Sequence, residues 1–495
     1  MSTLRLYQTA AIERVWQAMA EGRRRPILMM ATGAGKTKTA AEIIRRARAK
    51  GKRVVFTVPA VELIDQTTQA LWKEGIRDVG VIQANHAMTN PMAPVQVASV
   101  STLAQRGVPA DVDIVIVDEA HRASKVIFRW MAEEPATPFI GLSATPWTKG
   151  LGRHWNDLVI GATTRQLISE GYLSPFRVFA PSHPDLTGVR TVAGDYAEDE
   201  LAEAMDKPKL TADVVQTWLK LGENRPTLCF AVNRAHARSL ERDFQAAGVA
   251  VGYVDGKTPP SDRRELKRAF ASGEIRVVVN VGVLTTGVDW DVRCIILARP
   301  TKSEMLYVQI IGRGLRTAEG KADCLILDHS DTTLNLGFVT DIHHDRLSDG
   351  SERKAGVANR HERPAPTPKE CPSCSYLKPV GVHKCPSCGF APNKIEAVET
   401  AQGELAHLGG KQVKASMDDK RRWYSMLLYV EFERKYRHGW AANQYRDKFG
   451  VWPNGIQVEP RIPDVQVNNW IKSSQIRFWK RQEKAKKQAE ASHAA

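Results

Sequence analysis

An apolar segment that runs directly into a glycine-rich loop constrains this chain more than any other feature. The segment PILMM (26–30) is followed by Ala31, Thr32, Gly33, Ala34, Gly35, Lys36 and Thr37. Glycines let a backbone turn so that its N–H groups point inward at phosphate oxygens, and a helix that begins there adds the positive end of its dipole. This predicts a strand, a phosphate-binding loop and a helix, with Lys36 on the β- and γ-phosphates of ATP and Thr37 on Mg²⁺. The common form of this loop has glycine where this chain has Met30, and a chance glycine-rich turn is the alternative.

A second apolar segment, DIVIVD (113–118), ends in a pair of carboxylates, Asp118 and Glu119, followed by Ala120 and His121. A carboxylate at a strand end can hold Mg²⁺ directly or through water, and its neighbour can orient or deprotonate an attacking water. Acidic residues are common at exposed strand ends, so this pair alone is a weak signal. Downstream of a phosphate-binding loop, it predicts a site that hydrolyses ATP.

A third string, QIIGRGLR (309–316), lies far along the chain and offers two arginines. Arg313 and Arg316 are three residues apart and therefore share one helix face. The alternative is an accidental pair of surface arginines, but a glycine on each side of Arg313 indicates a close approach to another element. Because arginine neutralises charge on a transferring phosphate, the string predicts ATP held between two domains that close on binding and open on hydrolysis.

Short apolar runs alternate with helical patterns through two stretches of the 495 residues. A chain of this length is expected to form several domains, and the alternation predicts doubly wound, parallel α/β sheets. Strands are expected at 26–30, 54–58, 113–118 and 139–143, and then at 227–232, 249–254, 275–281, 294–298 and 324–328. The predicted order is an ATP-binding domain (1–150), a connecting region (151–210), a second α/β domain (211–340), a flexible linker (341–368), a cysteine-rich module (369–392) and a small helical domain (411–485).

The seven cysteines fall into two groups. Three stand singly in apolar runs and are expected in the core: Cys229, Cys294 and Cys324. Four form two CxxC pairs: Cys371, Cys374, Cys385 and Cys388. Four thiolates give a closed tetrahedral zinc site with a structural role, and a redox dithiol or an iron centre is the alternative. His383, between the pairs, is expected to be a bystander, while lysines near the module favour a phosphate-bearing partner: Lys369, Lys378, Lys384 and Lys394.

The charge balance favours a polyanionic partner. The formal net charge is +15, and residues 411–495 carry 18 Lys/Arg against 9 Asp/Glu. This excess favours nucleic acid over a membrane surface, although a charged tail can also serve solubility alone. The same 85 residues hold twelve aromatic residues, which are either core residues of a small domain or a stacking surface for unpaired bases.

The sequence shows no apolar run long enough to cross a membrane, about 18–20 residues, and its first residues lack the apolar segment of a signal peptide. We therefore expect a protein of the cytoplasm.

The order and spacing of these strings resemble the DExH-type helicases of superfamily 2. The resemblance covers residues 4–330 and is nearest to the branch with XPB- and UvsW-like helicases and restriction-enzyme motors, and to phage-encoded helicases. It implies two RecA-like domains. It also assigns roles in three groups: adenine or phosphate contacts at Arg5, Gln8, Gly287 and Asp289, with Gln309, Arg313 and Arg316 acting on ATP from the second domain; coupling at His121, Ser143 and Thr145; and nucleic-acid contacts at Pro59, Ser99, Thr102 and Thr286.

The resemblance implies a motor whose two domains grip a phosphodiester backbone and advance with each ATP cycle. Backbone contacts carry no sequence information, which suits a translocase. We expect an ATP-dependent DNA helicase or translocase with ATP, Mg²⁺ and Zn²⁺, in a bacterial or phage-infected cell. The alternatives are a duplex-DNA translocase subunit of a nuclease or remodelling complex, an RNA helicase, and a nucleic-acid-binding scaffold with an inactive ATPase. A protein partner could bind the zinc ribbon or the C-terminal domain.

Overall fold

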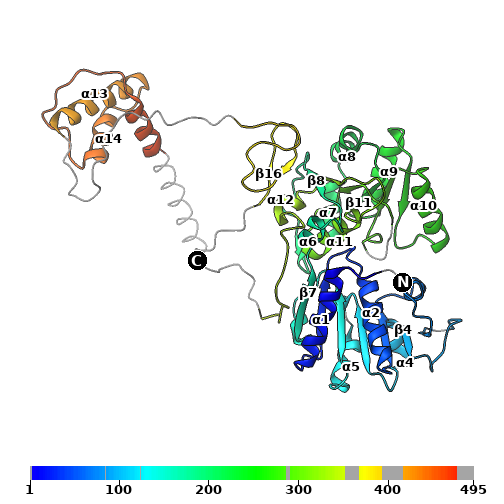
Figure 1. The fold of residues 1–495 in the computed structure, drawn as a ribbon. Helices are drawn as coiled ribbons and strands as arrows, with labels where there is room; N and C mark the ends of the chain where they lie inside the picture. The colour runs from blue at the N-terminus through cyan, green and yellow to red at the C-terminus, as the bar shows by residue number, and fades with distance from the viewer. Residues whose placement is uncertain are drawn as a thin grey trace, which may run out of the picture. The chain divides into compact units, whose positions relative to one another are not determined.

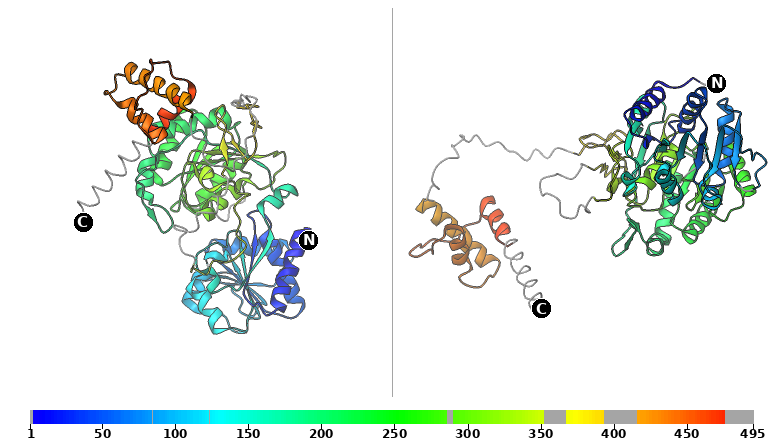
Figure 2. Two further views of the ribbon diagram at one scale, coloured as in Figure 1. Left: turned by 90° about the vertical axis from the view of Figure 1, so that its left-hand side faces the viewer. Right: turned by 90° about the horizontal axis from the view of Figure 1, so that it is seen from below.

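The computed structural model describes residues 3–83, 85–122, 124–285, 290–351, 367–392 and 416–475. The chain divides into two compact units, Met1–Lys394 and Ile395–Ala495. The first unit contains two α/β domains, which Figures 1 and 2 show as a blue and cyan lobe and a green lobe. In the part of the chain that is described, no helix is both long and apolar enough to span a bilayer.

The first domain is built on a parallel sheet of seven strands. Four of its strands, β1, β2, β4 and β6, are buried at every residue, as expected for a parallel sheet covered on both faces. In the order β3-β4-β2-β5-β6-β1-β7, the strands are β1 (Pro26–Met30), β2 (Val54–Val58), β3 (Val79–Ile82), β4 (Val95–Ser99), β5 (Ile114–Asp118), β6 (Phe139–Ser143) and β7 (Asp157–Ala162).

Helices cover both faces of this sheet. Helices α1 (Leu6–Ala20), α2 (Lys36–Ala49) and α3 (Leu63–Lys73) contribute their apolar residues to one core cluster, whereas α4 (Val100–Arg106) and α5 (Lys125–Glu133) contribute to another, beside the short helices η1 (Ala120–Arg122) and η2 (Leu151–Arg153). Because β1 and β5 run parallel, the glycine-rich loop after β1 and the carboxylates at the end of β5 lie at the same edge of the sheet.

The second domain repeats this architecture with six parallel strands, in the order β12-β13-β11-β14-β15-β8. The strands are β8 (Phe176–Phe179), β11 (Thr227–Phe230), β12 (Val251–Val254), β13 (Val277–Asn280), β14 (Cys294–Leu297) and β15 (Cys324–Asp328). Helices α8 (Pro208–Leu221) and α9 (Arg234–Ala246) pack in one core cluster, and α10 (Pro260–Ser272) and α11 (Glu304–Gly314) in another. The predicted fold class, two doubly wound parallel sheets, is confirmed.

The region between the two predicted domains contributes a strand to each sheet. Strand β7 joins the first sheet and β8 joins the second. The smaller elements of this region and beyond are α6 (Thr164–Ser169), β9 (Thr191–Val192), β10 (Asp195–Tyr196), α7 (Glu198–Met205) and α12 (Thr332–Leu336). Residues 170–175 therefore run directly from one domain to the other, and we call them the connector.

Residues 341–351, which the sequence places in a flexible linker, instead return to the first domain. The N–H of Gly152 donates to the carbonyl of Ser348 at 2.7 Å, and Nε of Arg153 donates to the carbonyl of Asp349 at 2.7 Å. Leu347 packs against the apolar cluster of α4 and α5. These contacts tie the chain that leaves the second domain back onto the first; residues 352–366 lie outside the described part.

The cysteine-rich module covers an edge of the second sheet. It contains the short antiparallel strands β16 (Lys369–Glu370) and β17 (Leu377–Lys378). Tyr376 forms an antiparallel bridge with Phe179 of the edge strand β8, and their rings lie 5.4 Å apart. An exposed edge strand invites unwanted pairing, so the module protects this edge.

The second unit is a small helical domain, as predicted. It contains α13 (Met417–Glu433), α14 (Trp440–Phe449) and a helix over residues 465–475. Trp423 and Tyr445 belong to the core of this domain, whereas Phe432 and Trp452 are 83% and 46% exposed; stacking on unpaired bases stays a prediction. Residues 411–415 and 476–485 of the predicted domain lie outside the described part.

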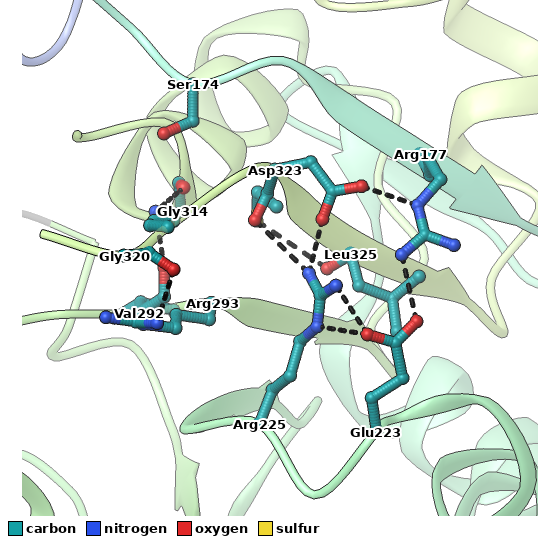
Figure 3. A network of polar contacts seen from close by, with 12 residues as sticks. Ser174, Arg177, Glu223, Arg225, Val292, Arg293, Gly314, Gly320, Asp323 and Leu325 are labelled. Carbon is teal, nitrogen blue, oxygen red and sulfur yellow. Dashed lines mark hydrogen bonds and ion pairs between the residues drawn. The ribbon is translucent and has the colours of Figure 1, made fainter. Parts of the chain in front are cut away.

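Four charged side chains form a network where the strands of the second sheet begin (Figure 3). Asp323 accepts hydrogen bonds from Arg177 and Arg225, each at 2.5 Å, and Glu223 pairs with the same two arginines. Burial opposes ionisation of Asp323, but the two arginines outweigh it and lower the pKa of the carboxyl. The network joins β8, β15 and the turn before β11.

We predict that Asp323→Asn destabilises the second domain by about 1–3 kcal/mol at pH 7, because it removes one of the two carboxylates that Arg177 and Arg225 share. A lowered folded-state pKa gives stability that is present at neutral pH and is lost as pH falls through that pKa. The difference from the parent protein should therefore shrink in acid. Thermal unfolding at several pH values measures it, with Glu274→Gln, from the exposed pair with Arg268, as the control. A loss no larger than that of the control would contradict the prediction.

Candidate active site

A cavity of about 530 Å³ opens between the two α/β domains. It falls in the range of ligand pockets and is lined by side chains from both sides. The first domain and the connector contribute Arg5, Thr32, Gly33, Gly35, Lys36, Thr37, Asp118, Glu119 and Tyr172, and the second domain contributes Arg313, Arg316 and Thr317. The structure thus brings together three strings that the sequence separates by almost three hundred residues.

The phosphate-binding loop has the geometry that its glycines predict. Gly33 and Gly35 have φ values of 86° and 77°, in the left-handed region that favours glycine. Space also requires them: a Cβ at Gly33 would lie 2.9 Å from Leu173, and one at Gly35 would lie 2.6 Å from Gln8. Helix α2 begins directly after the loop, at Lys36.

Two of the residues predicted to bind the nucleotide, Ala34 in the loop and Gln8 in α1, are bonded to each other. Ala34 is fully buried, and its carbonyl accepts hydrogen bonds from the hydroxyl of Tyr7 at 2.8 Å and from Nε2 of Gln8 at 3.1 Å. Gln8 is 2% exposed and does not line the cavity in this structure. Its supporting role was not apparent from the sequence.

Arg5 and Tyr172 form the wall of the cavity at one end. The Arg5 guanidinium lies 4.2 Å from the centre of the Tyr172 ring, and its Nη1 donates to the hydroxyl of Tyr7 at 3.2 Å. Such a planar cation on an aromatic face resembles the stacking partners of a base. Sequence reasoning missed Tyr172 because it lies in the region predicted only to connect domains.

Asp118 carries a carboxylate that needs a cation. Burial and the neighbouring charge of Glu119 raise its pKa to about 7, although Lys36 acts in the opposite direction. A bound Mg²⁺ would reverse this balance, and the oxygens of Asp118 and Thr37 are ligands of the kind that Mg²⁺ prefers. The donor set therefore fits the metal that the sequence predicts.

Glu119 is held in an unusual backbone conformation. Its φ is 47°, a region that non-glycine residues rarely adopt and that clusters at functional sites. Its Oε2 is buried, makes no hydrogen bond to a described residue, and lies 3.4 Å from Nδ1 of His121. A buried carboxylate oxygen beside the cavity is suitable for accepting a proton.

A hydrogen-bonded chain links His121, which follows the carboxylate pair in the sequence, to the second domain. Burial lowers the pKa of His121 to about 4, so its imidazole is neutral. Nδ1–H of His121 donates to Ser143 Oγ at 2.9 Å, which leaves Nε2 to accept from Gln309 at 3.3 Å. Gln309 also donates to Thr145 Oγ1 at 3.1 Å. Gln309 therefore bonds directly to His121 and Thr145, and reaches Ser143 through His121. It belongs to this hydrogen-bonded chain of side chains and does not line the cavity.

The glycines beside Arg313 allow two different close approaches. A Cβ at Gly312 would lie 2.6 Å from Cβ of Thr32 in the phosphate-binding loop, and one at Gly314 would lie 2.4 Å from Sγ of Cys324. Gly312 therefore faces the first domain, whereas Gly314 faces its own sheet. Nε of Arg313 donates to the carbonyl of Thr285 at 3.0 Å.

The residues predicted to contact nucleic acid are only partly placed at a surface. Pro59 lines the cavity. Ser99 is fully buried and Thr102 is 7% exposed; Ser99 Oγ accepts from the Thr102 N–H at 3.1 Å and thereby caps α4. Thr286, Gly287 and Asp289 lie outside the described residues. The nucleic-acid contacts therefore stay a prediction.

The four cysteines of the CxxC pairs converge, with their sulfur atoms within 4.8 Å of one another. The two turns have the same form: Ser375 N–H donates to Cys371 O, and Gly389 N–H donates to Cys385 O. Ser375 and Gly389 both have positive φ, 56° and 76°, so the serine adopts the conformation of the glycine. Four thiolates at this spacing fit a tetrahedral zinc ion. The metal-ligating group contains no histidine, consistent with His383 as a bystander.

Comparison with known proteins agrees with this arrangement. The family model "Type III restriction enzyme, res subunit" matches residues 1–148, and "Helicase conserved C-terminal domain" matches residues 207–318. The chain belongs to helicase superfamily 2. It is 28% identical over 407 residues to a 51.5 kDa protein of a Lactococcus phage, covering 80% of this chain and 85% of that protein.

The chain is also similar to the "Putative ATP-dependent helicase IRC3" of Saccharomyces cerevisiae. The identity is 30% over 352 residues, 66% of this chain, and the match spans about half (51%) of the yeast protein. A fragment of an HsdR-type subunit of a type I restriction enzyme from Vibrio vulnificus shares the fold, with a TM-score of 0.53 at 23% identity over 68% of this chain and 66% of that one. The family models and the helicase-named relatives support an ATPase, and the family implies ATP with Mg²⁺.

We predict that Gly312→Ala lowers kcat for ATP hydrolysis by about 10- to 100-fold, because the added methyl group meets Thr32 and holds the domains apart. Alanine favours a helix over glycine by roughly 1 kcal/mol, so thermal stability should not fall. Gly256→Ala is the control, since a Cβ there meets no atom within 4 Å. Parent-like turnover by Gly312→Ala would contradict the prediction.

We also predict that a strong zinc chelator, or Cys371→Ser with Cys374→Ser, removes one zinc per chain and lowers the midpoint of thermal unfolding. Metal binding supplies much of the folding energy of so small a module, and its loss uncovers the edge strand β8. Metal analysis of the purified protein and calorimetry test this. Iron in place of zinc, or unchanged unfolding after metal loss, would refute it.

Proposed function

We propose that this chain is a nucleic-acid-stimulated ATPase that converts ATP hydrolysis into movement along DNA. One observation carries the proposal: Lys36, Glu119, Arg313 and Arg316 line the same cavity between two domains. A site divided in this way responds to ATP by closing and to hydrolysis by opening. An inactive scaffold would have no need for this complete set.

The first domain supplies the fixed half of the chemistry. Lys36 and the N–H groups of the loop would hold the β- and γ-phosphates, and Thr37 and Asp118 would hold Mg²⁺. Glu119 accepts the proton of the attacking water, and its carboxylate lies 3.4 Å from Nδ1 of His121. Arg5 and Tyr172 receive the adenine.

The second domain supplies charge to the transferring phosphate. Arg313 and Arg316 neutralise charge as the bond to the γ-phosphate breaks, a contribution that reaches about 10³–10⁵ in kcat for arginine fingers. The contacts from Gly312 to Thr32 and from Gln309 to His121 form when the domains close, and they link closure to the position of the acidic pair. After hydrolysis these contacts weaken and the domains separate.

DNA is the favoured track. The first domain matches a restriction-enzyme family model, and the net charge of +15 suits a polyanion. The same match favours movement along duplex DNA as a second candidate beside strand separation. The zinc ribbon and the basic helical domain would serve as additional grips.

We predict that Lys36→Ala and Glu119→Gln each lower ATP turnover by at least about 100-fold while DNA binding survives. Glu134→Gln, at an exposed residue after α5, is the matched control. Turnover is measured without nucleic acid and with single-stranded DNA, duplex DNA, forked DNA and RNA. We expect stimulation by DNA above RNA, and greatest stimulation by duplex would favour the duplex translocase. Equal rates of ATP hydrolysis with and without nucleic acid, or normal turnover by Glu119→Gln, would contradict the proposal.

A further inference from the structure

A lysine outside the predicted strings holds the main chain that carries the arginines. Lys321 lies in the loop between α11 and β15. Its Nζ donates to the carbonyls of Val292 and Arg316, each at 2.7 Å, and to the carbonyl of Gly314. An ammonium group has three protons, so these three carbonyls use all of them.

The positions of the three carbonyls give this contact its meaning. The last carbonyls of a helix lack partners within the helix; Gly314, the last residue of α11, supplies such a carbonyl, and Arg316 lies two residues further along. A cation is favourable at this negative end of the helix dipole. Val292 belongs to the segment that leads into β14, so Lys321 also ties the end of α11 to a second segment of its domain.

The connector holds the same stretch from another side. The Ser174 N–H donates to the carbonyl of Leu315 at 2.7 Å, and Ser174 Oγ donates to the carbonyl of Arg316 at 3.3 Å. Leu173 forms an antiparallel bridge with Arg316. Figure 3 shows Ser174, Gly314 and Val292 grouped together, apart from the ion network around Asp323.

We propose that Lys321 is a positioning residue for ATP hydrolysis, which fixes the end of α11 so that Arg316 reaches the γ-phosphate from the second domain. The inference rests on the proposed role of Arg316. Lys321 does not line the cavity and therefore acts through the main chain. Its partial burial lowers the pKa of its ammonium group, but the three hydrogen bonds favour the charged form.

The consequence is specific to turnover. Without Lys321, the carbonyls of Val292 and Gly314 lose this donor, that of Arg316 keeps only its bond from Ser174 among those described above, and the end of α11 can shift. A displacement of about 1 Å in a catalytic group can cost on the order of 100-fold in rate. The surfaces that bind ATP in the first domain are unaffected, because Lys36 and Arg5 lie on other elements.

The test is a double-mutant cycle on ATP turnover in the full chain with saturating DNA. We expect Lys321→Met to lower kcat by about 10- to 100-fold with less than a threefold change in KM for ATP. Lys321→Arg, which keeps a donor, should recover part of the loss. If Lys321 acts through Arg316, then Arg316→Ala with Lys321→Met should be no slower than Arg316→Ala alone.

The matched control is Arg293→Met. Arg293 donates to the carbonyls of Glu319 and Gly320 in the same loop but not to those at the end of α11, so its kcat should stay within twofold of the parent. Additive losses in the double mutant, or an equal loss from Arg293→Met, would overturn the proposal. Parent-like turnover by Arg316→Ala would instead overturn the proposed function, so the two failures are distinguishable.

Discussion

The approach of helix α11 to the phosphate-binding loop is the contact on which the remaining features depend. Gly312 lies so close to Thr32 that an added Cβ would be 2.6 Å away, and Gln309, one turn earlier, bonds to His121. Both contacts require the second domain to sit against the cavity edge of the first. When they form, Arg313 and Arg316 join Lys36 and Glu119 in one cavity; when they are broken, each domain holds only half of a site.

Several structures around this contact maintain its alignment. The connector contains Tyr172, which lines the cavity. Its next residues, Leu173 and Ser174, contact the backbone of Leu315 and Arg316. Lys321 binds the same backbone from inside the second domain. Residues 341–351 return to the first domain, and the zinc ribbon covers the free edge of the second sheet. We therefore expect the two domains to move relative to each other about these contacts.

The parts that could be predicted from sequence are those with a local physical signature. Parallel strands appeared as continuous apolar runs, and Gly33 and Gly35 indicated a backbone turn in the left-handed conformation. Gly312 indicated a close approach to another element, but the sequence did not show which element. The four cysteines specified their own cluster by spacing alone.

The parts that were missed depend on contacts between distant segments. No sequence pattern marks Tyr172, Lys321 or residues 341–351, which return to the first domain. Lys321 and residues 341–351 make their contacts through main-chain carbonyls, and every residue has such a carbonyl. The supporting role of Gln8 and the burial of Ser99 follow from packing that a linear string does not encode. Strands β3, β4, β7 and β8 escaped notice because they lie at or near sheet edges or are short.

The central claim is that ATP joins two half-sites by closing the domains. Its most direct test is single-molecule fluorescence energy transfer between labels at Glu134 in the first domain and Gln245 in the second, in the Glu119→Gln background with DNA present. We predict that ATP converts a broad distance distribution into one narrow, closed population, and that adding Lys36→Ala abolishes this change. The same distribution with and without ATP would contradict the account.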